Sequence, residues 1–555
     1  MTPERKITWL ILILSFVAIC TNAEDDTIIE TKQGKVSGFT LSVLSDTVTA
    51  YTGIPYAEAP IGFKRFQKPE PRKPWLGIHK ATKFGNSCYQ SKSEAYSELP
   101  GVDKWLVKNE MSEDCLNLNV WVPQSISKPA HVMVFIYGGG FISGTSSLAV
   151  YDGSVLAATE KVIVVSMNYR VGALGFLAFP GSKDVPGNSG LFDQRLALQW
   201  VHDNIAAFGG DPGSVTLFGQ SAGAASVGYH VLSTGSHSYF KRVIIQSGSP
   251  TADWAFNSKE RARILSLKLA QRIGCPTEDD NSTIACLKNV DAKEIIHKQL
   301  PTDSKFELTY FVPTIDNDFL LDVPKNLVNQ TNKHIDILIG VTKDDGNPFP
   351  VFAGQGISTK YLSLITTEQL EQGLRQFFPP GEELAIESFK LLYIDWDDEG
   401  NQEKNRDALA KILKDYYFTC PSKYFASFAA ETTNNVFVYE YDHRPSNEVW
   451  PQWMGAIHGA ELPIIFGNPF SAPQEFSQEE QAFSKRIMKM WANFAREGNP
   501  SDDGFVWPHY STGDQNHAIL KMNNISVRQK WSGQNCQFWN FYYPEQVKKH
   551  RKILT

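Results

Sequence analysis

The chain has 555 residues, of which 42% are hydrophobic and 20% are charged, and its formal net charge is −7. These values are ordinary for a globular protein. The mild negative charge gives no sign of the basic surface that nucleic-acid binding requires, so we expect no nucleic-acid partner.

Residues 1–23 match the pattern of a secretory signal peptide. Arg5 and Lys6 precede an apolar run, Ile7–Cys20, and small residues follow at positions 21–23. The run is short for a membrane span, and acidic residues begin at once with Glu24. We therefore expect a secreted, extracellular protein that has lost this segment and carries no membrane anchor.

The cysteines and sequons agree with a secreted glycoprotein. Six cysteines remain beyond the signal peptide, and an even number favours three disulfides, although about fifteen pairings are open. They are Cys88, Cys115, Cys275, Cys286, Cys420 and Cys536. Asn281, Asn329 and Asn524 begin Asn-x-Ser/Thr sequons, so we expect glycosylation at these surface positions.

Runs of strand length recur along the mature chain. Alternating strands at Thr27–Phe39 and Thr47–Tyr56 predict an antiparallel edge on a larger sheet. The later runs are mostly apolar, which suits a mostly parallel sheet covered by helices on both faces, and so an α/β fold. These runs are Leu116–Val122, His131–Ile136, Val162–Met167, Val215–Phe218, Val243–Gln246, Ile335–Ile339 and Val436–Tyr441.

Two helices are marked by their spacing and caps. Residues 193–207 have apolar residues at helical spacing. Ser477 and Glu480 form a capping box, and the apolar stripe that follows ends at Gly498. Since no linker or repeat interrupts the chain, we predict a single domain over residues 24–545 and a short basic tail over residues 546–555.

Residues 215–223 combine a strand, an isolated serine and the start of a helix. The apolar run ends at Gly219, and Ser221 stands between Gly219 and Gly223. This G-x-S-x-G pattern is typical of a nucleophile turn, in which small neighbours allow a strained serine to expose its hydroxyl above the sheet. We predict that Ser221 is a nucleophile, provided that the chain supplies a base, an acid and an oxyanion hole.

A candidate acid and a candidate base follow Ser221 in the order used by α/β hydrolases. Asp345 lies in the segment 343–346, which follows the predicted strand Ile335–Ile339, and His458 lies in a glycine-containing loop. A serine hydroxyl needs such a base, oriented by an acid. A packed histidine and an ordinary charged turn are the alternatives, and the pattern alone does not separate the turn from a functional Asp345.

The segment Tyr137–Phe141 is a candidate oxyanion hole. The segment directly follows the strand His131–Ile136 and contains three consecutive glycines, so backbone N–H groups of Gly139 and Gly140 can approach a substrate oxygen. The N–H of Ala222, next to the nucleophile, is expected to be the third donor. A phosphate-binding loop is the competing interpretation, but no Gly-Lys-Ser/Thr follows the glycines.

On these residues the sequence resembles the type-B carboxylesterases, and more closely the butyrylcholinesterase-like cholinesterases. The stretches that carry the resemblance are 113–120, 137–147, 164–176, 208–227 and 453–459, within a similarity that runs from about residue 25 to residue 543. It implies an α/β-hydrolase fold with a gorge above the serine, and no metal or organic cofactor. It assigns Ser221 as nucleophile, Asp345 as acid, His458 as base, and Gly139, Gly140 and Ala222 as oxyanion hole. It also implies the pairs Cys88–Cys115, Cys275–Cys286 and Cys420–Cys536.

The resemblance further suggests which residues bind substrate. Trp105 matches the choline-site tryptophan of the family, and Trp254, Phe349 and Phe418 match aromatic gorge positions. Gln220 stands where cholinesterases carry a glutamate beside the nucleophile. Charge attraction of a choline cation is expected to be weaker for this reason.

Three further positions differ from the cholinesterases. Ser93 replaces an aspartate at the gorge rim, Ala460 replaces a tyrosine after the histidine, and Asp345 replaces the usual glutamate. Residues 306–310 lack the aromatic pair of acetyl-selective enzymes, so no acyl preference is assigned. The tail that joins some cholinesterases into tetramers is missing, and we expect a monomer or homodimer.

We therefore expect a secreted serine carboxylic ester hydrolase that forms an acyl-enzyme on Ser221 with a small-molecule ester. A cholinesterase proper, acting on acetylcholine or other choline esters, is the first alternative. A non-catalytic adhesion or binding protein on the same fold is the alternative from another class. Such proteins usually lose the nucleophile, whereas Ser221, Asp345 and His458 are all present here.

Overall fold

The computed structural model describes residues 27–91, 101–300, 310–330, 334–352, 357–358, 362–378, 383–432 and 435–554. The predicted signal peptide, Ser93 and residues 306–309 lie outside these ranges. Within them, no helix combines the length and the apolar character needed to cross a membrane.

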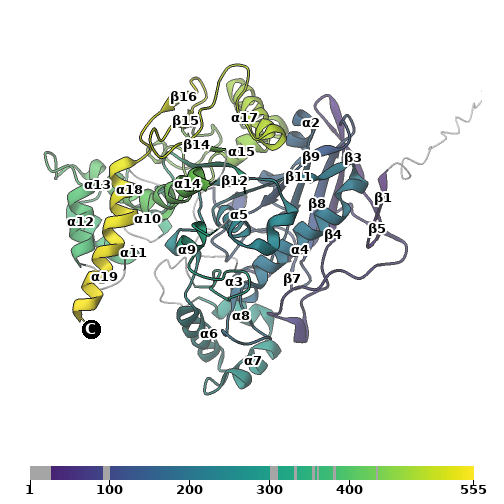
Figure 1. Cartoon of the computed structure of the whole chain (residues 1–555), viewed down its shortest axis with the longest axis horizontal. Helices are drawn as coiled ribbons and strands as arrows, with labels where there is room; N and C mark the ends of the chain where they lie inside the picture. Colours follow the sequence, from purple (N-terminus) through teal and green to yellow (C-terminus); the bar gives the residue numbers. More distant parts are fainter. Residues whose placement is uncertain are drawn as a thin grey trace, which may run out of the picture.

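One large sheet runs through the molecule (Figure 1). Its strands are β3 (Phe39–Val43), β4 (Asp46–Pro55), β8 (Asn117–Pro123), β9 (Ala130–Ile136), β10 (Ile163–Met167), β11 (Gly210–Gln220), β12 (Arg242–Gln246), β13 (Asp336–Thr342), β14 (Val436–Tyr441), β15 (His517–Leu520) and β16 (Ser526–Arg528). In the described part of the chain the sheet has 11 strands, in the order β16-β15-β14-β13-β12-β11-β9-β10-β8-β4-β3. Each neighbouring pair of strands between β15 and β10 in this order is parallel. The pairs outside this range, β16 with β15 at one edge and β10 with β8, β8 with β4 and β4 with β3 at the other, are antiparallel. The predicted α/β fold with a mostly parallel sheet is confirmed.

The first predicted strand segment does not join this sheet. Strands β1 (Ile28–Thr31) and β2 (Gly34–Ser37) pair with each other and with β5 (Ile78–Lys80) in a separate three-stranded sheet. The prediction of a sheet edge over Thr27–Phe39 was therefore wrong for β1 and β2. Alternation identifies a strand but not its partner, and here the partner strand is β5, more than 30 residues away in the chain.

The predicted helices are present with small changes at their ends. Helix α4 (Ser189–Asn204) begins four residues before the predicted start, and a 3-10 turn, Ile205–Phe208, follows it. Helix α17 (Gln478–Glu497) has the predicted capping box, and Gly498 ends it at φ 75°. The described chain also contains β6 (Ser87–Cys88), β7 (Met111–Ser112), α2 (Ser154–Glu160), α3 (Gly172–Phe176), α5 (Ala222–Leu232), α6 (Lys259–Ile273), α7 (Asp280–Asn289), α8 (Ala292–Lys298), α9 (Pro324–Val328), α10 (Pro348–Phe352), α11 (Thr367–Phe377), α12 (Glu383–Tyr393), α13 (Gln402–Lys414), α14 (Cys420–Thr432), α15 (Leu462–Ile465), α16 (Asn468–Ser471), α18 (Gly533–Gln537) and α19 (Tyr543–Leu554).

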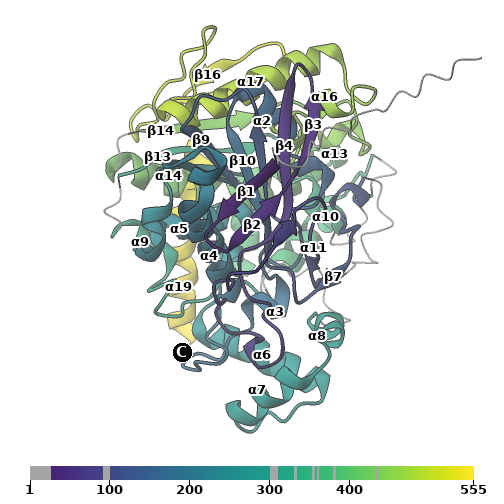
Figure 2. The ribbon, with the colours of Figure 1, turned by 90° about the vertical axis from the view of Figure 1, so that its right-hand side faces the viewer.

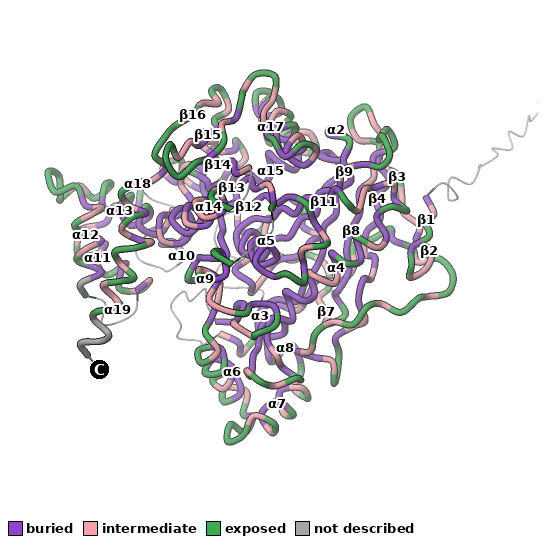
Figure 3. The backbone as a smooth tube through the Cα atoms, viewed as in Figure 1, coloured by how far each residue is buried: buried purple, intermediate pink, exposed green. Residues whose placement is uncertain are grey.

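Helices cover the sheet on both faces. α2 and α17 pack together on one side of the central strands, whereas α4 and α5 pack on the other side (Figure 1). Helices α6, α7 and α8 lie at the lower end of the molecule in both views (Figure 2). The central strands are buried along almost their whole length, as continuous apolar runs require, so the carboxyl ends of these strands lie inside the molecule (Figure 3).

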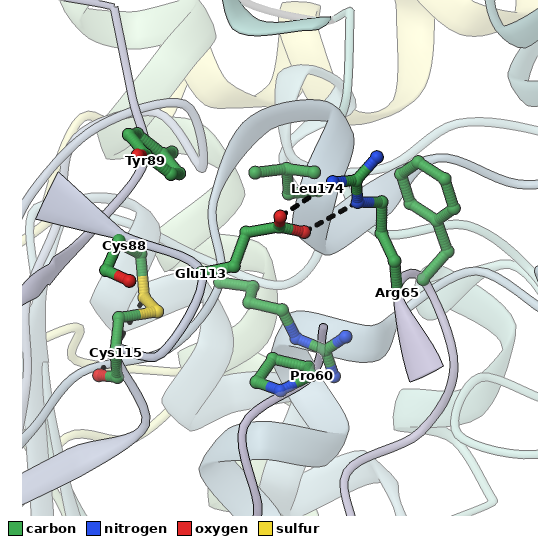
Figure 4. A pocket seen from close by; sticks show the side chains of 10 residues that line it. Pro60, Arg65, Cys88, Tyr89, Glu113, Cys115 and Leu174 are labelled. Carbon is green, nitrogen blue, oxygen red and sulfur yellow. Dashed lines mark hydrogen bonds and ion pairs between the residues drawn. A yellow bond between two sulfur atoms is a disulfide. The ribbon is translucent and has the colours of Figure 1, made fainter. Parts of the chain in front are cut away.

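The six cysteines within the described ranges all form disulfides. The pairs are Cys88–Cys115, Cys275–Cys286 and Cys420–Cys536, in agreement with the pairs that the resemblance implies. Beside the first pair, Arg65 makes two hydrogen bonds to the Glu113 carboxylate, at 2.6 and 2.7 Å (Figure 4). This partly buried bidentate contact anchors the base of the disulfide loop that carries Trp105.

Candidate active site

Ser221 occupies a strained turn between β11 and α5. Its backbone has φ 58° and ψ −124°, a conformation that side-chain-bearing residues rarely adopt. The turn is held by hydrogen bonds from the Ser221 N–H to the Gln246 carbonyl, at 2.8 Å, and from the Ala225 N–H to the Ser221 carbonyl, at 3.0 Å. Strain of this kind persists only where the surrounding structure imposes it.

Glycines make this turn possible because other backbone passes directly against it. A Cβ on Gly223 would collide with the Ile136 carbonyl, and a Cβ on Gly248 would collide with the Ser221 carbonyl. A Cβ on Gly138 would lie 2.8 Å from the Ser221 Cβ. The glycine loop after β9 therefore lies beside Ser221, as the predicted arrangement requires.

Asp345 and His458 form a hydrogen-bonded pair next to this turn. The Asp345 Oδ1 lies 2.7 Å from the His458 Nδ1, so the imidazole donates its Nδ1 proton to the carboxylate. The Asp345 Oδ2 accepts the Ser247 hydroxyl at 2.8 Å and the Thr342 N–H at 3.0 Å. With this tautomer, the Nε2 of a neutral His458 is an acceptor, which is the state a general base needs.

The partner of the His458 Nε2 is Gln220. The Gln220 Nε2 lies 3.1 Å from it and donates the hydrogen bond, since the imidazole nitrogen is the acceptor. Within the described ranges, no hydrogen bond joins the Ser221 hydroxyl to His458. The predicted triad residues are thus adjacent, but the contact between serine and base is not formed in this state.

The glycine loop beside Ser221 contains backbone N–H groups without an acceptor among the described residues. Gly139 and Gly140 have φ of 118° and 60°, and the N–H groups of Gly139, Gly140 and Ala222 donate to no acceptor among the residues that the structure describes. Tyr137 and Tyr169 hold the start of the loop by stacking at 4.5 Å and by exchanging hydroxyl–carbonyl hydrogen bonds. N–H donors that have no partner at this position can stabilise a developing oxyanion by hydrogen bonds.

The Gln90 amide holds the far end of the same loop. It donates to the Gly144 carbonyl and accepts the Gly144 N–H, both at 2.8 Å. Gln90 is buried and also donates to the Cys88 carbonyl. The oxyanion candidate is therefore attached to the first disulfide.

Aromatic side chains surround the histidine. The Phe418 ring stacks on His458 at 4.6 Å, and the Phe349 ring lies 5.7 Å from it. Trp254 lies 6.2 Å from Phe418, and its indole N–H donates to the Tyr417 carbonyl at 2.9 Å. The Trp105 ring lies beside Gly459, 3.6 Å from the position of an added Cβ. The structure thus gathers the four predicted aromatic residues around the Asp345–His458 pair.

A buried carboxyl that the sequence analysis missed lies near this pair. Glu461 is fully buried, and its Oε1 accepts the Gln246 amide at 3.3 Å, whereas its Oε2 has no partner among the described residues. Burial, and next the charge of Asp345, raise the pKa of Glu461 to about 7. An acidic residue within the apolar segment Ala460–Ile464 was the signal that could have marked it.

The sequence analysis also missed Ser247, which donates to Asp345, and the separate contacts of Asp344. Ser247 follows β12 at φ 48°, but a serine in a Ser-Gly-Ser turn carries no specific signal. The sequon residues Asn281, Asn329 and Asn524 are all exposed. The Gly139–Gly140 pair precedes Gln220 by about 80 residues, and Gln220 precedes His458 by 238 residues, so only the fold brings them together.

The parallel sheet, the strained strand-to-helix serine and the buried carboxylate–imidazole pair define the class of the α/β hydrolases. The sequence profile of the Carboxylesterase family matches residues 25–539. The chain belongs to the carboxylesterase family, and its enzyme class is serine carboxylic ester hydrolase.

Three similar proteins cover nearly the whole chain. A protein named Cholinesterase from Mus musculus is 45% identical over 98% of this chain and 92% of its own length. An Acetylcholinesterase from Bungarus fasciatus is 42% identical over 97% and 90%, respectively. An Acetylcholinesterase from Danio rerio is 44% identical over 94% of this chain and 89% of its own length. The predicted resemblance to the cholinesterase type of this family is confirmed.

Proposed function

We propose that this protein is a secreted esterase that cleaves small carboxylic esters through an acyl-enzyme on Ser221. The observation that carries the proposal is the 2.7 Å contact between Asp345 and His458 beside the strained Ser221. A buried carboxylate fixes the tautomer of the imidazole, and this is what makes a neighbouring serine hydroxyl nucleophilic.

In the proposed reaction, His458 first exchanges Gln220 for the Ser221 hydroxyl as its Nε2 partner. His458 takes the hydroxyl proton while the Ser221 Oγ attacks the ester carbonyl. The resulting oxyanion accepts hydrogen bonds from the N–H groups of Gly139, Gly140 and Ala222. His458 then gives its proton to the leaving alcohol, which leaves the acyl group on Ser221. Water repeats the attack and releases the acid, and Asp345 stabilises the imidazolium in both halves.

We propose broad carboxylic esters as the substrates, with choline esters second. The site is lined by aromatic rings, which can bind an alkyl or aryl ester through apolar contacts. These rings belong to Trp105, Trp254, Phe349 and Phe418. A tryptophan face attracts a quaternary ammonium by roughly 0.5–2 kcal/mol. Gln220, however, is neutral, so the proposed site lacks a carboxylate directly beside the serine.

An ester panel on the wild type and on Ser221→Ala tests the proposal. We expect the wild type to hydrolyse short neutral esters and the variant to lose at least 10³-fold in kcat, since a triad acts as a unit. Equal hydrolysis by both proteins would refute the assignment of Ser221. A fluorophosphonate probe is expected to label Ser221 in the folded protein, and a folded protein that stays unlabelled would favour the non-catalytic binding role.

The choline-ester alternative rests on the names of the similar proteins, Cholinesterase and Acetylcholinesterase. Acetylthiocholine and an equal-sized neutral thioester separate the two substrate classes. We expect comparable kcat/KM for both thioesters. A preference for the cation of more than about 100-fold would reverse the order that we propose.

Secretion, glycosylation and oligomeric state are proposals as well. The predicted signal peptide, three disulfides and three exposed sequon residues support a secreted glycoprotein. We expect the protein in the medium of expressing cells, with a mass that falls on treatment with a glycosidase specific for N-linked glycans. Sedimentation of the secreted protein is expected to give a monomer or a homodimer.

A further inference from the structure

Two consecutive aspartates follow β13, and the structure gives them different neighbours. Asp345 contacts the His458 ring, as described above. Asp344 instead faces the backbone of the loop that precedes this histidine. Its Oδ2 accepts the Ala456 N–H at 2.8 Å, and its own N–H donates to the Ala456 carbonyl at 3.0 Å.

A third contact extends this connection. The Asn347 side-chain amide donates to the Met454 carbonyl at 2.8 Å, and the Asn347 N–H donates to the Asp344 carbonyl at 3.1 Å. The loop between the two acceptors turns at Gly455, which has φ 63°. A Cβ on Gly455 would collide with the Asp344 carboxylate, so the loop needs a glycine where it crosses this side chain.

We infer that Asp344 is a positioning residue that holds the backbone of residues 454–456 and thereby places His458 between Asp345 and Ser221. The segment that carries the acid and the segment that carries the base are joined by the Asp344 and Asn347 contacts two to four residues before His458. The inference rests on the proposed function, because it concerns the same base. A misplacement of about 1 Å at such a site can lower the rate by about 10²-fold.

The charges around Asp344 argue against a role in stability alone. Burial raises the pKa of the Asp344 carboxyl to about 6, against the opposing effects of the Ala456 N–H and of two lysines. Lys343 is paired with Asp442 at 3.1 Å, and Lys414 with Glu440 at 2.9 Å. Asp442 adds a like charge that raises the pKa further.

The sign of this effect separates function from stability. The pKa of Asp344 is higher in the folded chain than its ordinary 3.8, so its ionisation destabilises the fold as the pH rises through about 6. Asp344→Asn removes this cost and keeps the size of the side chain. If Asp344 served only to stabilise the fold, Asp344→Asn would be less stable than the wild type at pH 8.

The first test is kinetic. At pH 8 we expect kcat of Asp344→Asn to fall about 10-fold and that of Asp344→Ala about 100-fold, with KM changed by less than twofold. Between pH 7 and pH 5 the wild type is expected to lose an additional factor of about ten in kcat/KM, which Asp344→Asn lacks. The thermal midpoint of Asp344→Asn at pH 8 is expected to equal or exceed that of the wild type.

Asp442→Asn is the matched control, since Asp442 lies nearby but contacts Lys343 rather than the loop. We expect wild-type kcat from this variant. The inference is overturned if Asp344→Asn keeps the wild-type kcat and pH profile, or if its loss of kcat comes with a matching loss of thermal midpoint.

Hydrogen exchange of residues 453–459 provides a measurement that needs no activity. We expect exchange at pH 8 to be about tenfold faster in Asp344→Asn and unchanged in Asp442→Asn. Unchanged exchange in Asp344→Asn would overturn the inference even if the protein proved to be no esterase. An inactive Ser221→Ala together with a fully active Asp344→Asn would refute the role of Asp344 and leave the proposed function intact.

Discussion

The side chains of Gln220 and Ser221 are neighbours in sequence and compete for the same atom of His458. The Gln220 amide holds the Nε2 at 3.1 Å, and the proposed reaction requires the Ser221 hydroxyl there. An amide donor stabilises the neutral imidazole, whereas a carboxylate at the same position would accept from the imidazolium. The residue before the serine therefore influences both the hydrogen bonding of the base and the charge of the site.

Gln220→Glu is expected to change both properties. The new carboxylate can accept a hydrogen bond from the imidazolium, so the acid limb of kcat/KM is expected to move to higher pH. The ratio of kcat/KM for acetylthiocholine to that for a neutral thioester is expected to rise about tenfold. Gln452→Glu, which adds the same charge at an exposed position, is expected to change neither by more than twofold. An unchanged ratio in Gln220→Glu would show that Gln220 does not set cation preference.

The ionisation of Glu461, like that of Asp344, is expected to lower the stability of the fold. Its pKa is raised from an ordinary 4.5 to about 7 in the folded chain, so its contribution to stability is lost as the pH rises through this interval. The difference corresponds to roughly 3 kcal/mol, at about 1.4 kcal/mol for each pKa unit. Glu461→Gln is expected to be more stable than the wild type at pH 8 and closer to it at pH 5. Denaturant unfolding at both pH values measures this, and a stability difference that does not depend on pH would contradict it.

At the scale of elements, the strand–turn–helix unit of β11 and α5 depends on close packing of backbone against backbone. Gly219, Gly223 and Gly248 each lie where a Cβ would collide with a neighbouring main chain. Main-chain atoms cannot rotate away as a flexible side chain can, so these contacts are strict. The same close approach brings the glycine loop to Ser221.

Gly223→Ala is expected to disrupt this unit. The added methyl would meet the Ile136 carbonyl and lie 2.7 Å from the Tyr137 carbonyl, so β9 and α5 have to separate. We expect loss of secreted protein, or a loss of several kcal/mol in stability together with loss of esterase activity. Gly400→Ala is the control, because no heavy atom lies within 4 Å of its added methyl. Normal stability and activity of Gly223→Ala would show that the packing relaxes at no cost.

At the scale of the whole molecule, the disulfides close loops of different lengths in the chain. Cys275–Cys286 closes a separation of 11 residues and joins the end of α6 to α7, whereas Cys420–Cys536 spans 116 residues and joins α14 to α18. In the chain-entropy description, a longer loop restrains the unfolded chain more. The C-terminal region is thus attached to the fold by its longest covalent loop.

Removal of the two bridges is expected to differ in cost. Cys420→Ala/Cys536→Ala should lose about 5 kcal/mol and Cys275→Ala/Cys286→Ala about 3 kcal/mol in the chain-entropy description. The half-life of esterase activity on heating compares the variants if unfolding proves irreversible. A greater loss from the shorter loop would show that local strain or packing outweighs loop entropy.

The sequence by itself determined the features that depend on neighbouring residues. A strained serine requires small residues on either side, so the Gly219–Gly223 turn can be predicted from adjacent residues. The same holds for the Ser477 capping box and for the apolar runs of the buried strands. These signals predicted the α/β fold, and the resemblance they support led to the confirmed family.

Only the tertiary structure decided which side chains meet. Asp344 and Asp345 are indistinguishable as a charged pair, yet one contacts the loop backbone and the other the His458 ring, 113 residues away in the chain. Likewise, the sequence marked Gln220 because it is neutral where cholinesterases carry a glutamate, whereas the structure gave it the His458 Nε2 as a partner. The physical reason is that hydrogen bonds depend on distances of a few tenths of an ångström, and these are set by how distant loops pack above the sheet.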